Sequence, residues 1–134
     1  VDTGSTDKTI NIAREFDANI FEFEWNENFS AARNESIKHA TKDWVLVLDA
    51  DEVLDEEGKK TIKELVNGKE NDAFMLLQKN YTNDTKIAGF VNEEYIKDGK
   101  KYAGWYGSLI IRLFRNKKGS CPLLSKFQRV LVSK

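Results

Sequence analysis

The chain has 134 residues, 40% hydrophobic and 32% charged, which is the composition of an ordinary globular domain. The net charge of −1 excludes the strongly basic balance typical of nucleic-acid binding, so we expect no nucleic-acid partner. No apolar run approaches the roughly 20 residues needed to cross a bilayer. The single cysteine excludes an internal disulfide, and we therefore expect a cytoplasmic protein.

The first half of the chain alternates short strands with helices. Apolar residues at helical spacing predict helices over residues 10–16 and 30–40, with a short strand at 20–23 between them. A third helix is predicted from the acidic start at 55–57 to the Asn-Gly stop at 67–68. This alternation favours a parallel α/β sheet with right-handed crossovers, whose ligands bind beyond the carboxyl ends of the strands.

Residues 44–52, Trp-Val-Leu-Val-Leu-Asp-Ala-Asp-Glu, lie between the second and third predicted helices. Five consecutive apolar residues predict a strand buried on both faces, and three carboxylates follow at its end. Alternation places Asp49 and Asp51 on one side of the chain, where two carboxylates could share Mg²⁺ or Mn²⁺. An acidic, solvated turn explains these residues equally well.

The second half reads as strands without helices between them. Residues 73–78 and 108–115 predict strands, 87–91 a weak strand, and 127–132 a last one. We expect these strands to be antiparallel or mixed. Charged, glycine-containing turns are predicted at 97–101 and 116–119.

Two polar segments of the first half could bind a nucleotide. Asp2 could accept hydrogen bonds from a base or ribose, because the Gly4-Ser5 turn lets a planar ligand approach the backbone. The alternative is a plain turn with a helix cap. Arg33, next to Asn34, could donate to a uracil-type carbonyl or a phosphate; the alternative is an exposed helix arginine.

Aromatic and basic side chains offer weaker hypotheses. Three aromatic residues either pack against the protein or stack on a sugar: Trp25, Trp105 and Tyr106. Four basic residues either form a solvated strand edge or attract a phosphate-bearing ligand: Arg112, Arg115, Lys117 and Lys118.

Three segments together resemble the family 2 glycosyltransferases with the GT-A fold. They are residues 1–9 (Val-Asp-Thr-Gly-Ser-Thr-Asp-Lys-Thr), 28–34 (Asn-Phe-Ser-Ala-Ala-Arg-Asn) and 44–52, in the family's order and spacing. Residues 108–119 resemble the segment that follows in the bacterial and archaeal branch. The resemblance implies an α/β fold, a Rossmann-like three-layer sandwich with a mainly parallel central sheet and a mixed or antiparallel C-terminal part.

The resemblance also implies an activity. Family members transfer a sugar from a nucleotide diphosphate sugar, here a UDP-sugar, to an acceptor hydroxyl on a saccharide or lipid-linked molecule. An inverting mechanism with Mg²⁺ or Mn²⁺ is expected. The growing charge on the diphosphate is then neutralised by the cation, and a separate carboxylate deprotonates the acceptor.

Carried over by position, the family's site falls on few residues. Asp2, with Gly4 and Ser5, would contact the base, and Arg33 and Asn34 would lie near the base or phosphates. Asp49 would lie near the ribose and metal, and Asp51 would coordinate the metal. The catalytic base stays unassigned: Glu93 and Glu94 are acidic and downstream, but no matching motif position identifies either of them as the base.

We expect residues 1–134 to form one partial domain, with a nucleotide-binding half at 1–72 and an acceptor-side half at 73–134. The chain begins at the end of what should be the family's second strand, so we expect a piece of a longer protein. An unpaired sheet edge would favour association of two copies. Two alternatives stay open: a nucleotidyltransferase, although the usual Gly-rich phosphate loop is missing, and a nucleotide-sugar-binding remnant without turnover.

Overall fold

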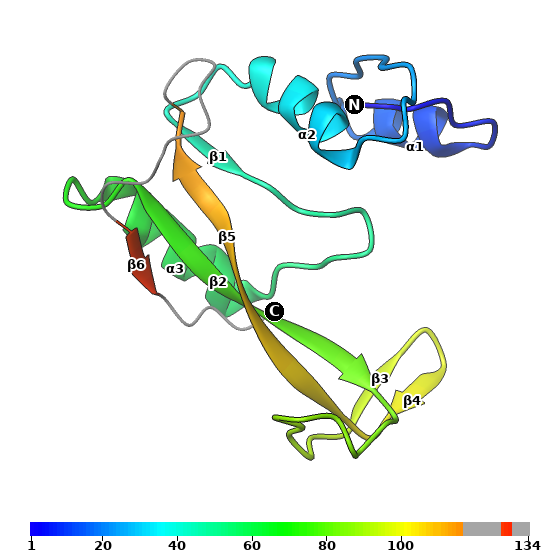
Figure 1. Cartoon of the computed structure of the whole chain (residues 1–134), viewed down its shortest axis with the longest axis vertical. Helices are drawn as coiled ribbons and strands as arrows, with labels where there is room; N and C mark the ends of the chain where they lie inside the picture. The colour runs from blue at the N-terminus through cyan, green and yellow to red at the C-terminus, as the bar shows by residue number, and fades with distance from the viewer. Residues whose placement is uncertain (117–126, 130–134) are drawn as a thin grey trace. The chain divides into compact units, whose positions relative to one another are not determined.

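The computed structural model describes residues 1–116 and 127–129. Its elements, shown in Figure 1, follow in chain order: α1 (Thr9–Glu15), α2 (Phe29–Lys38), β1 (Trp44–Leu46), α3 (Glu56–Asn67), β2 (Ala73–Thr82), β3 (Tyr95–Lys97), β4 (Lys100–Tyr102), β5 (Gly104–Arg115) and β6 (Phe127–Arg129).

The described residues divide into two compact units. The first holds Val1–Asp43 together with Asn116, and the second holds Trp44–Arg115 together with 127–129. These units are defined by contacts within the chain. The predicted halves, 1–72 and 73–134, are defined by ligand roles, and those roles stay predictions.

The first unit carries α1, α2 and a short parallel pairing. The backbone N–H of Asp2 donates to the Phe21 carbonyl at 2.8 Å, and that of Phe23 donates to the Asp2 carbonyl at 2.9 Å. These bonds make a single parallel bridge between Asp2 and Glu22, where the sequence predicts a strand. Helix α2 starts before the predicted residue 30 because the Asn28 side chain caps it, accepting from the Ala31 N–H at 3.0 Å.

The second unit is built on a four-stranded sheet of order β1-β5-β2-β6. β5 pairs antiparallel with both β1 and β2, and only β2 and β6 pair parallel. The mainly parallel central sheet that we expected is therefore not what the described residues form. The chain between β2 and β5 contains no helix to carry a parallel crossover, so β5 returns antiparallel. The mixed sheet predicted for the C-terminal part is confirmed.

Strand β1 differs from its prediction in both length and burial. Its regular pairing covers only Trp44–Leu46, and each of these residues is half-buried. The prediction of a strand over 44–48 buried on both faces is wrong, because β1 lies at the edge of the described sheet with β5 as its only neighbour. Leu48 has already left the sheet and is 39% exposed.

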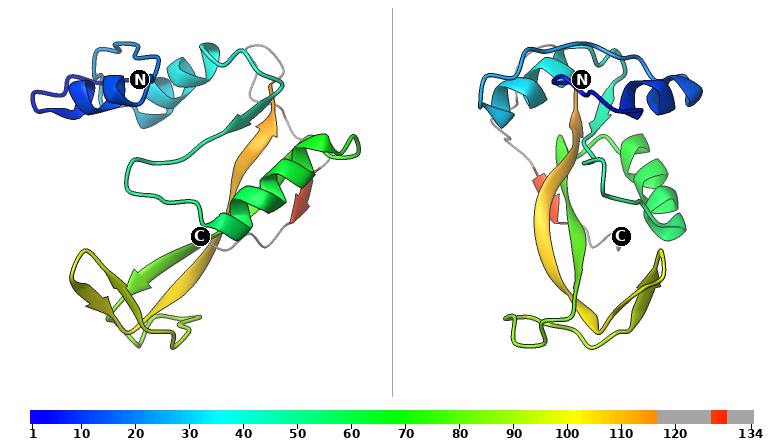
Figure 2. Two further views of the ribbon diagram at one scale, coloured as in Figure 1. Left: turned by 180° about the vertical axis from the view of Figure 1, so that it is seen from behind. Right: turned by 90° about the vertical axis from the view of Figure 1, so that its right-hand side faces the viewer.

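Helix α3 covers one face of this sheet (Figure 2). Phe74, Leu76 and Leu113 are buried beneath it, and Ile62 and Leu65 of the helix pack against them. The helix begins and ends where the sequence predicts, with Asp55 as its N-cap and Gly68 as its C-cap. None of the helices in the described part of the chain is long and apolar enough to cross a membrane.

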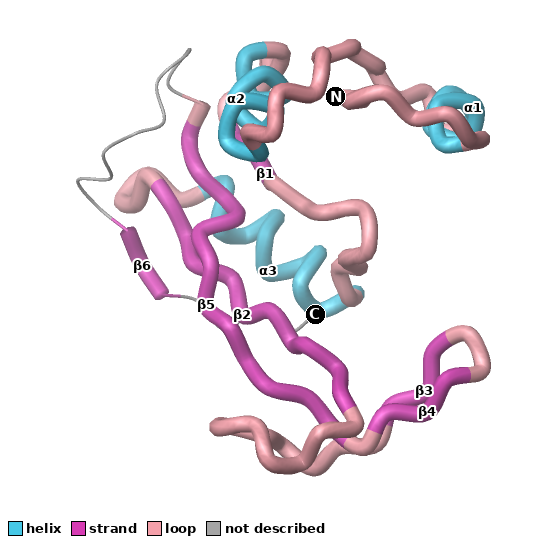
Figure 3. Tube along the Cα trace, turned by 45° about the vertical axis from the view of Figure 1, so that its right-hand side comes forward, coloured by secondary structure: helices cyan, strands magenta, loops and turns pink. Residues whose placement is uncertain are grey.

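Strands β3 and β4 form a separate hairpin next to the far end of β2 and β5 (Figure 3). Asp98 and Gly99 connect them with φ angles of 51° and 75°, as a tight Asp-Gly hairpin turn requires. This turn was predicted at 97–101. The weak strand predicted at 87–91 reduces to one bridge between Val91 and Trp105. The predictions for 117–119 and 130–132 lie outside the described residues.

Candidate active site

The Asp2 carboxylate organises the turn that follows it. One oxygen, Oδ2, accepts from the backbone N–H groups of Gly4 at 2.9 Å and Ser5 at 3.0 Å. The other, Oδ1, accepts from the Ser5 hydroxyl at 2.5 Å. A carboxylate has about four acceptor positions, so one stays available for a ligand N–H or hydroxyl. The three predicted residues Asp2, Gly4 and Ser5 are therefore joined in one turn.

These bonds lower the pKa of Asp2 below its ordinary value of 3.8, with the Ser5 hydroxyl as the largest cause and the Gly4 and Ser5 N–H groups next. Hydrogen bonds to the ionised form favour that form. The stabilisation is therefore complete above the ordinary pKa of an aspartate, and it is lost as the pH falls through the lowered value. Asp2 is an anion at neutral pH.

Replacing Ser5 by alanine should raise the pKa of Asp2 toward its ordinary value, because the largest of the three favourable bonds is removed. A pH titration followed through the carboxyl carbon by NMR would measure the change. Ser36→Ala is the matched control, since the Ser36 hydroxyl donates to the Arg33 carbonyl instead. An unchanged Asp2 titration in Ser5→Ala would contradict the assignment.

Arg33 and Asn34 lie on α2, in the same unit as Asp2, and both are exposed. Asp49 and Asp51 lie in the other unit. A common nucleotide site for the two sets of residues is therefore a proposal that rests on their order in the chain.

Asp49 begins an acidic turn held together by an arginine. The Glu52 N–H donates to the Asp49 carbonyl, and the Asp49 N–H donates to Glu52 Oε2, both at 3.0 Å. Arg112 of β5 then donates through Nη2 to Asp49 Oδ2 at 2.9 Å and to Glu52 Oε1 at 2.7 Å. The Arg112 and Glu52 side chains are only 4% and 5% exposed. Arg112 thus ties the two ends of the turn to the sheet.

Neither predicted role for Arg112 is what the structure shows. We expected a solvated strand edge or a phosphate-attracting cluster, whereas Arg112 is buried and paired with carboxylates. Its position in the apolar run Leu-Ile-Ile-Arg-Leu-Phe is the signal that could have found it, because a charge among buried residues needs a partner. Arg115 is half-buried and donates to the Gly68 carbonyl at 2.8 Å, and Lys117 and Lys118 lie outside the described residues.

Asp51 is an exposed carboxylate of this turn, in which the Asp49 side chain is 42% exposed as well. Within the described part of the chain the Asp51 side chain takes part in no hydrogen bond or ion pair, and it lines a pocket of the second unit. No group of three or more acidic, cysteine or histidine side chains that could hold a metal occurs among the described residues. Mg²⁺ and Mn²⁺ take one or two protein carboxylates and complete their shell with substrate phosphates and water, so a metal site on Asp49 and Asp51 stays a prediction.

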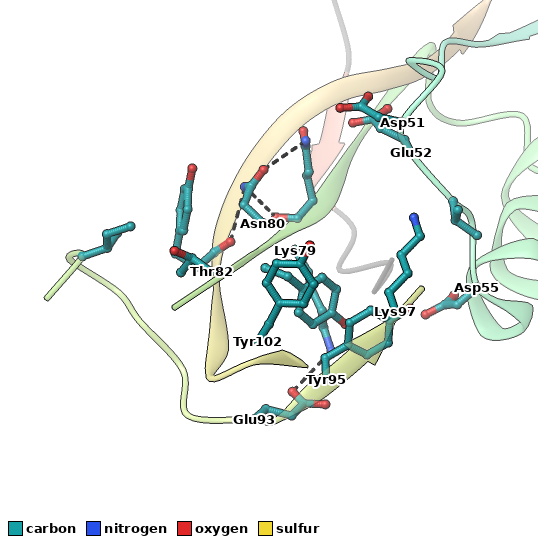
Figure 4. Close-up of a pocket in the computed structure, with 15 residues that line it drawn as sticks. Asp51, Glu52, Asp55, Lys79, Asn80, Thr82, Glu93, Tyr95, Lys97 and Tyr102 are labelled. Carbon is teal, nitrogen blue, oxygen red and sulfur yellow. Dashed lines mark hydrogen bonds and ion pairs between the residues drawn. The ribbon is translucent and has the colours of Figure 1, made fainter. Parts of the chain in front are cut away.

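The pocket next to Asp51 has a volume of about 810 Å³ and is shown in Figure 4. Tyr81, Tyr95, Tyr102 and Tyr106 contribute to its walls. Sequence reasoning singled out only Tyr106 of these. The other three come from β2, β3 and β4, and only the docking of the hairpin brings them together.

Two of the predicted sugar-stacking residues make other contacts. Trp105 donates through its indole N–H to Glu93 Oε2 at 2.6 Å, and Lys79 lies over its ring at 4.7 Å from the centroid. Trp25 packs edge-on against Phe29 in the first unit, with ring centroids 4.8 Å apart.

Comparison with known proteins confirms the family that the sequence resembles. Residues 1–127 match the sequence profile described as Glycosyl transferase family 2. The match covers almost the whole chain, so this protein belongs to family 2 of the glycosyltransferases, whose members have the GT-A fold.

Curated relatives match over shorter stretches. A TPR repeat-containing protein of Synechococcus elongatus is 45% identical over 78 residues, which is 58% of this chain and 19% of that protein. The SPbeta prophage-derived glycosyltransferase SunS of Bacillus subtilis is 39% identical over 64 residues, or 46% of this chain and 15% of that protein. The chain thus spans less than a fifth of the length of these relatives.

Proposed function

We propose that this chain binds a nucleotide diphosphate sugar, with a UDP-sugar as the expected donor, and transfers the sugar to an acceptor hydroxyl with inversion. Family membership supports a glycosyltransferase over a nucleotidyltransferase. The observation that carries the metal-dependent part of the proposal is the acidic turn. Arg112 engages Asp49 and Glu52, while Asp51 faces a pocket wide enough for a substrate.

Five of the predicted residues contact the donor or the cation in this proposal, and Gly4 and Ser5 hold the Asp2 carboxylate in place. Asp2 accepts hydrogen bonds from the nucleotide through the acceptor position that its own turn leaves available. Arg33 and Asn34 donate to the base or the phosphates. Asp51 is the first ligand of Mg²⁺ or Mn²⁺, and Asp49, whose Oδ2 is already bound to Arg112, completes the pair. The cation would supply positive charge against the diphosphate leaving group.

Calorimetric titration of the 134-residue chain with UDP-glucose tests the proposal. Binding is expected in Mn²⁺ and is expected to weaken by more than about tenfold in EDTA, because the diphosphate then meets the Asp49 and Asp51 carboxylates without a cation between them. Equal affinity in EDTA would contradict the metal dependence. Parallel titrations with GDP-mannose and dTDP-glucose test the donor class, and no binding of any of the three would contradict donor recognition.

A second experiment separates transfer from binding alone. Release of UDP from UDP-glucose, measured over hours in Mn²⁺, is expected if the chain carries the chemical step. Tight donor binding without any UDP release, with or without added sugar acceptors, would favour the nucleotide-sugar-binding alternative for this chain.

A further inference from the structure

The pocket beside Asp51 is lined by aromatic and polar side chains that the proposed donor site does not involve. Figure 4 shows Asp51 and Glu52 at one end of its lining and Glu93 at the other. Tyr95 and Tyr102 from the β3–β4 hairpin and Asn80 from β2 lie in its walls. A donor bound at Asp51 would leave the part of the pocket near Glu93 for a second molecule.

The aromatic wall of this pocket is continuous. The Tyr81 and Tyr95 rings stack with centroids 4.1 Å apart, and Tyr102 lies 6.2 Å from Tyr81. Tyr95 remains 38% exposed, so part of its side chain is accessible to a ligand. A sugar ring has apolar C–H groups on its faces, and burying them against an aromatic ring is favourable.

Polar groups stand beside this aromatic wall. Glu93 uses Oε2 for both Trp105 and Lys79, at 2.6 Å and 3.5 Å, and its other oxygen makes no further bond within the described chain. The Trp105 bond, with Lys79 nearby, lowers the pKa of Glu93, so the group stays an acceptor at neutral pH. Burial raises the pKa of Tyr81, whose phenol stays a donor. A ring bearing hydroxyls matches such a mixture of acceptors, donors and apolar surface.

The charges of the lining decide which sugars fit. The lining contains four carboxylates (Asp51, Glu52, Asp55 and Glu93) and two cationic side chains (Lys79 and Lys97). Because Glu52 is paired with Arg112, three carboxylates remain against the two cations. A sugar that carries its own carboxylate would meet this excess of negative charge, which disfavours it, whereas the donor diphosphate would be bridged to Asp51 by the cation. An uncharged sugar meets no such cost.

We propose that this pocket binds one uncharged sugar ring of the acceptor, with Tyr95 against its face and Glu93 accepting from a hydroxyl. The inference rests on the proposed glycosyl transfer. It extends the proposed function by giving the acceptor a chemical class, an uncharged saccharide in place of an acidic sugar, and by giving that saccharide a site.

Saturation-transfer NMR on the 134-residue chain tests the proposal, with uncharged methyl pyranosides (gluco, galacto, manno and N-acetylglucosamine) as probes. At least one should receive saturation from the protein, and its affinity should fall about threefold to tenfold in Tyr95→Ala. Tyr95→Phe, which keeps the ring, should bind as the parent does. Ile96→Ala is the matched control, because Ile96 is the next residue of β3, is 64% exposed and is not part of the lining.

Two comparisons make the result decisive. The methyl glucuronide differs from the methyl glucoside by one carboxylate and should bind more weakly. UDP-glucose binding should be unchanged in Tyr95→Ala, which separates this site from the donor site. The proposal is overturned if no uncharged pyranoside binds, if the glucuronide binds as well as the glucoside, or if Ile96→Ala loses as much as Tyr95→Ala. Loss of UDP-glucose binding in Tyr95→Ala also overturns it, since the hairpin would then serve the fold or the donor.

Discussion

Replacing Arg112 by methionine is expected to lower the free energy of unfolding by about 3–5 kcal/mol. The Glu52 side chain is 5% exposed and accepts from Arg112 at 2.7 Å, so the substitution leaves a buried carboxylate without its cation. Methionine fills a similar volume, and the cost therefore reports the lost charge pairing more than a cavity. Urea unfolding followed by tryptophan fluorescence would measure it, because Trp44 packs against the core of the same unit.

Arg115→Met is the matched control for this loss. Arg115 lies three residues further along β5, and its side chain is 29% exposed. Its Nε atom is 3.7 Å from Asp72 Oδ1. Partly exposed pairs contribute about 1 kcal/mol or less, so its replacement should cost much less. Glu52→Leu combined with Arg112→Met should recover part of the stability, because the buried charge is removed with its partner. Equal losses in the two single variants would contradict the account of the Arg112 ion pairs.

Local signals in the sequence predicted those parts of the fold that depend on neighbouring residues. The cap at Asp55, the stop at Gly68 and the Asp98-Gly99 turn each act within a few residues, and each is where it was expected. The strand over 108–115 was likewise visible from its own residues, and the structure extends it to Gly104.

Long-range partners were not predictable in the same way. Arg112 meets Asp49 across 63 residues, and no local pattern names that partner. The apolar run at 44–48 looked like a buried central strand, because composition alone does not say whether a strand has one neighbour or two. In the described sheet β1 has a single neighbouring strand, β5, and the residues of β1 are half-exposed for that reason.

The candidate site shows the same division. Asp2, Gly4 and Ser5 form their turn through contacts two and three residues apart, as their sequence suggested. The tyrosine wall depends on β2, β3 and β4 meeting at one place, and nothing in the spacing of Tyr81, Tyr95 and Tyr102 predicts it. Chemistry carried by adjacent residues can be read in a sequence, and a pocket wall assembled from three strands cannot.

Replacing Asp51 by asparagine is expected to weaken Mn²⁺-dependent binding of UDP-glucose by more than about tenfold while leaving the protein folded. Asparagine keeps the shape of the side chain and removes the charge that a hard cation needs. Asp51 is exposed and makes no hydrogen bond or ion pair within the described residues, so stability should change by no more than about 0.5 kcal/mol. Calorimetry with UDP-glucose and Mn²⁺ measures the affinity, and urea unfolding measures the stability.

Two further variants serve as controls for the effect of Asp51→Asn on donor binding and stability. Glu57→Gln removes a charge from the exposed first turn of α3. It should leave donor binding unchanged and lower the free energy of unfolding by no more than about 1 kcal/mol, the contribution of an acidic side chain at a helix N-terminus. Asp49→Asn should reduce both, because the Asp49 carboxylate also pairs with Arg112 at 2.9 Å. If Asp51→Asn binds donor and metal as the parent does, Asp51 is not a ligand. The acidic turn would then have a structural role, in which Arg112 attaches it to the sheet. The alternative given by the sequence, an acidic turn without a metal, would be the correct one.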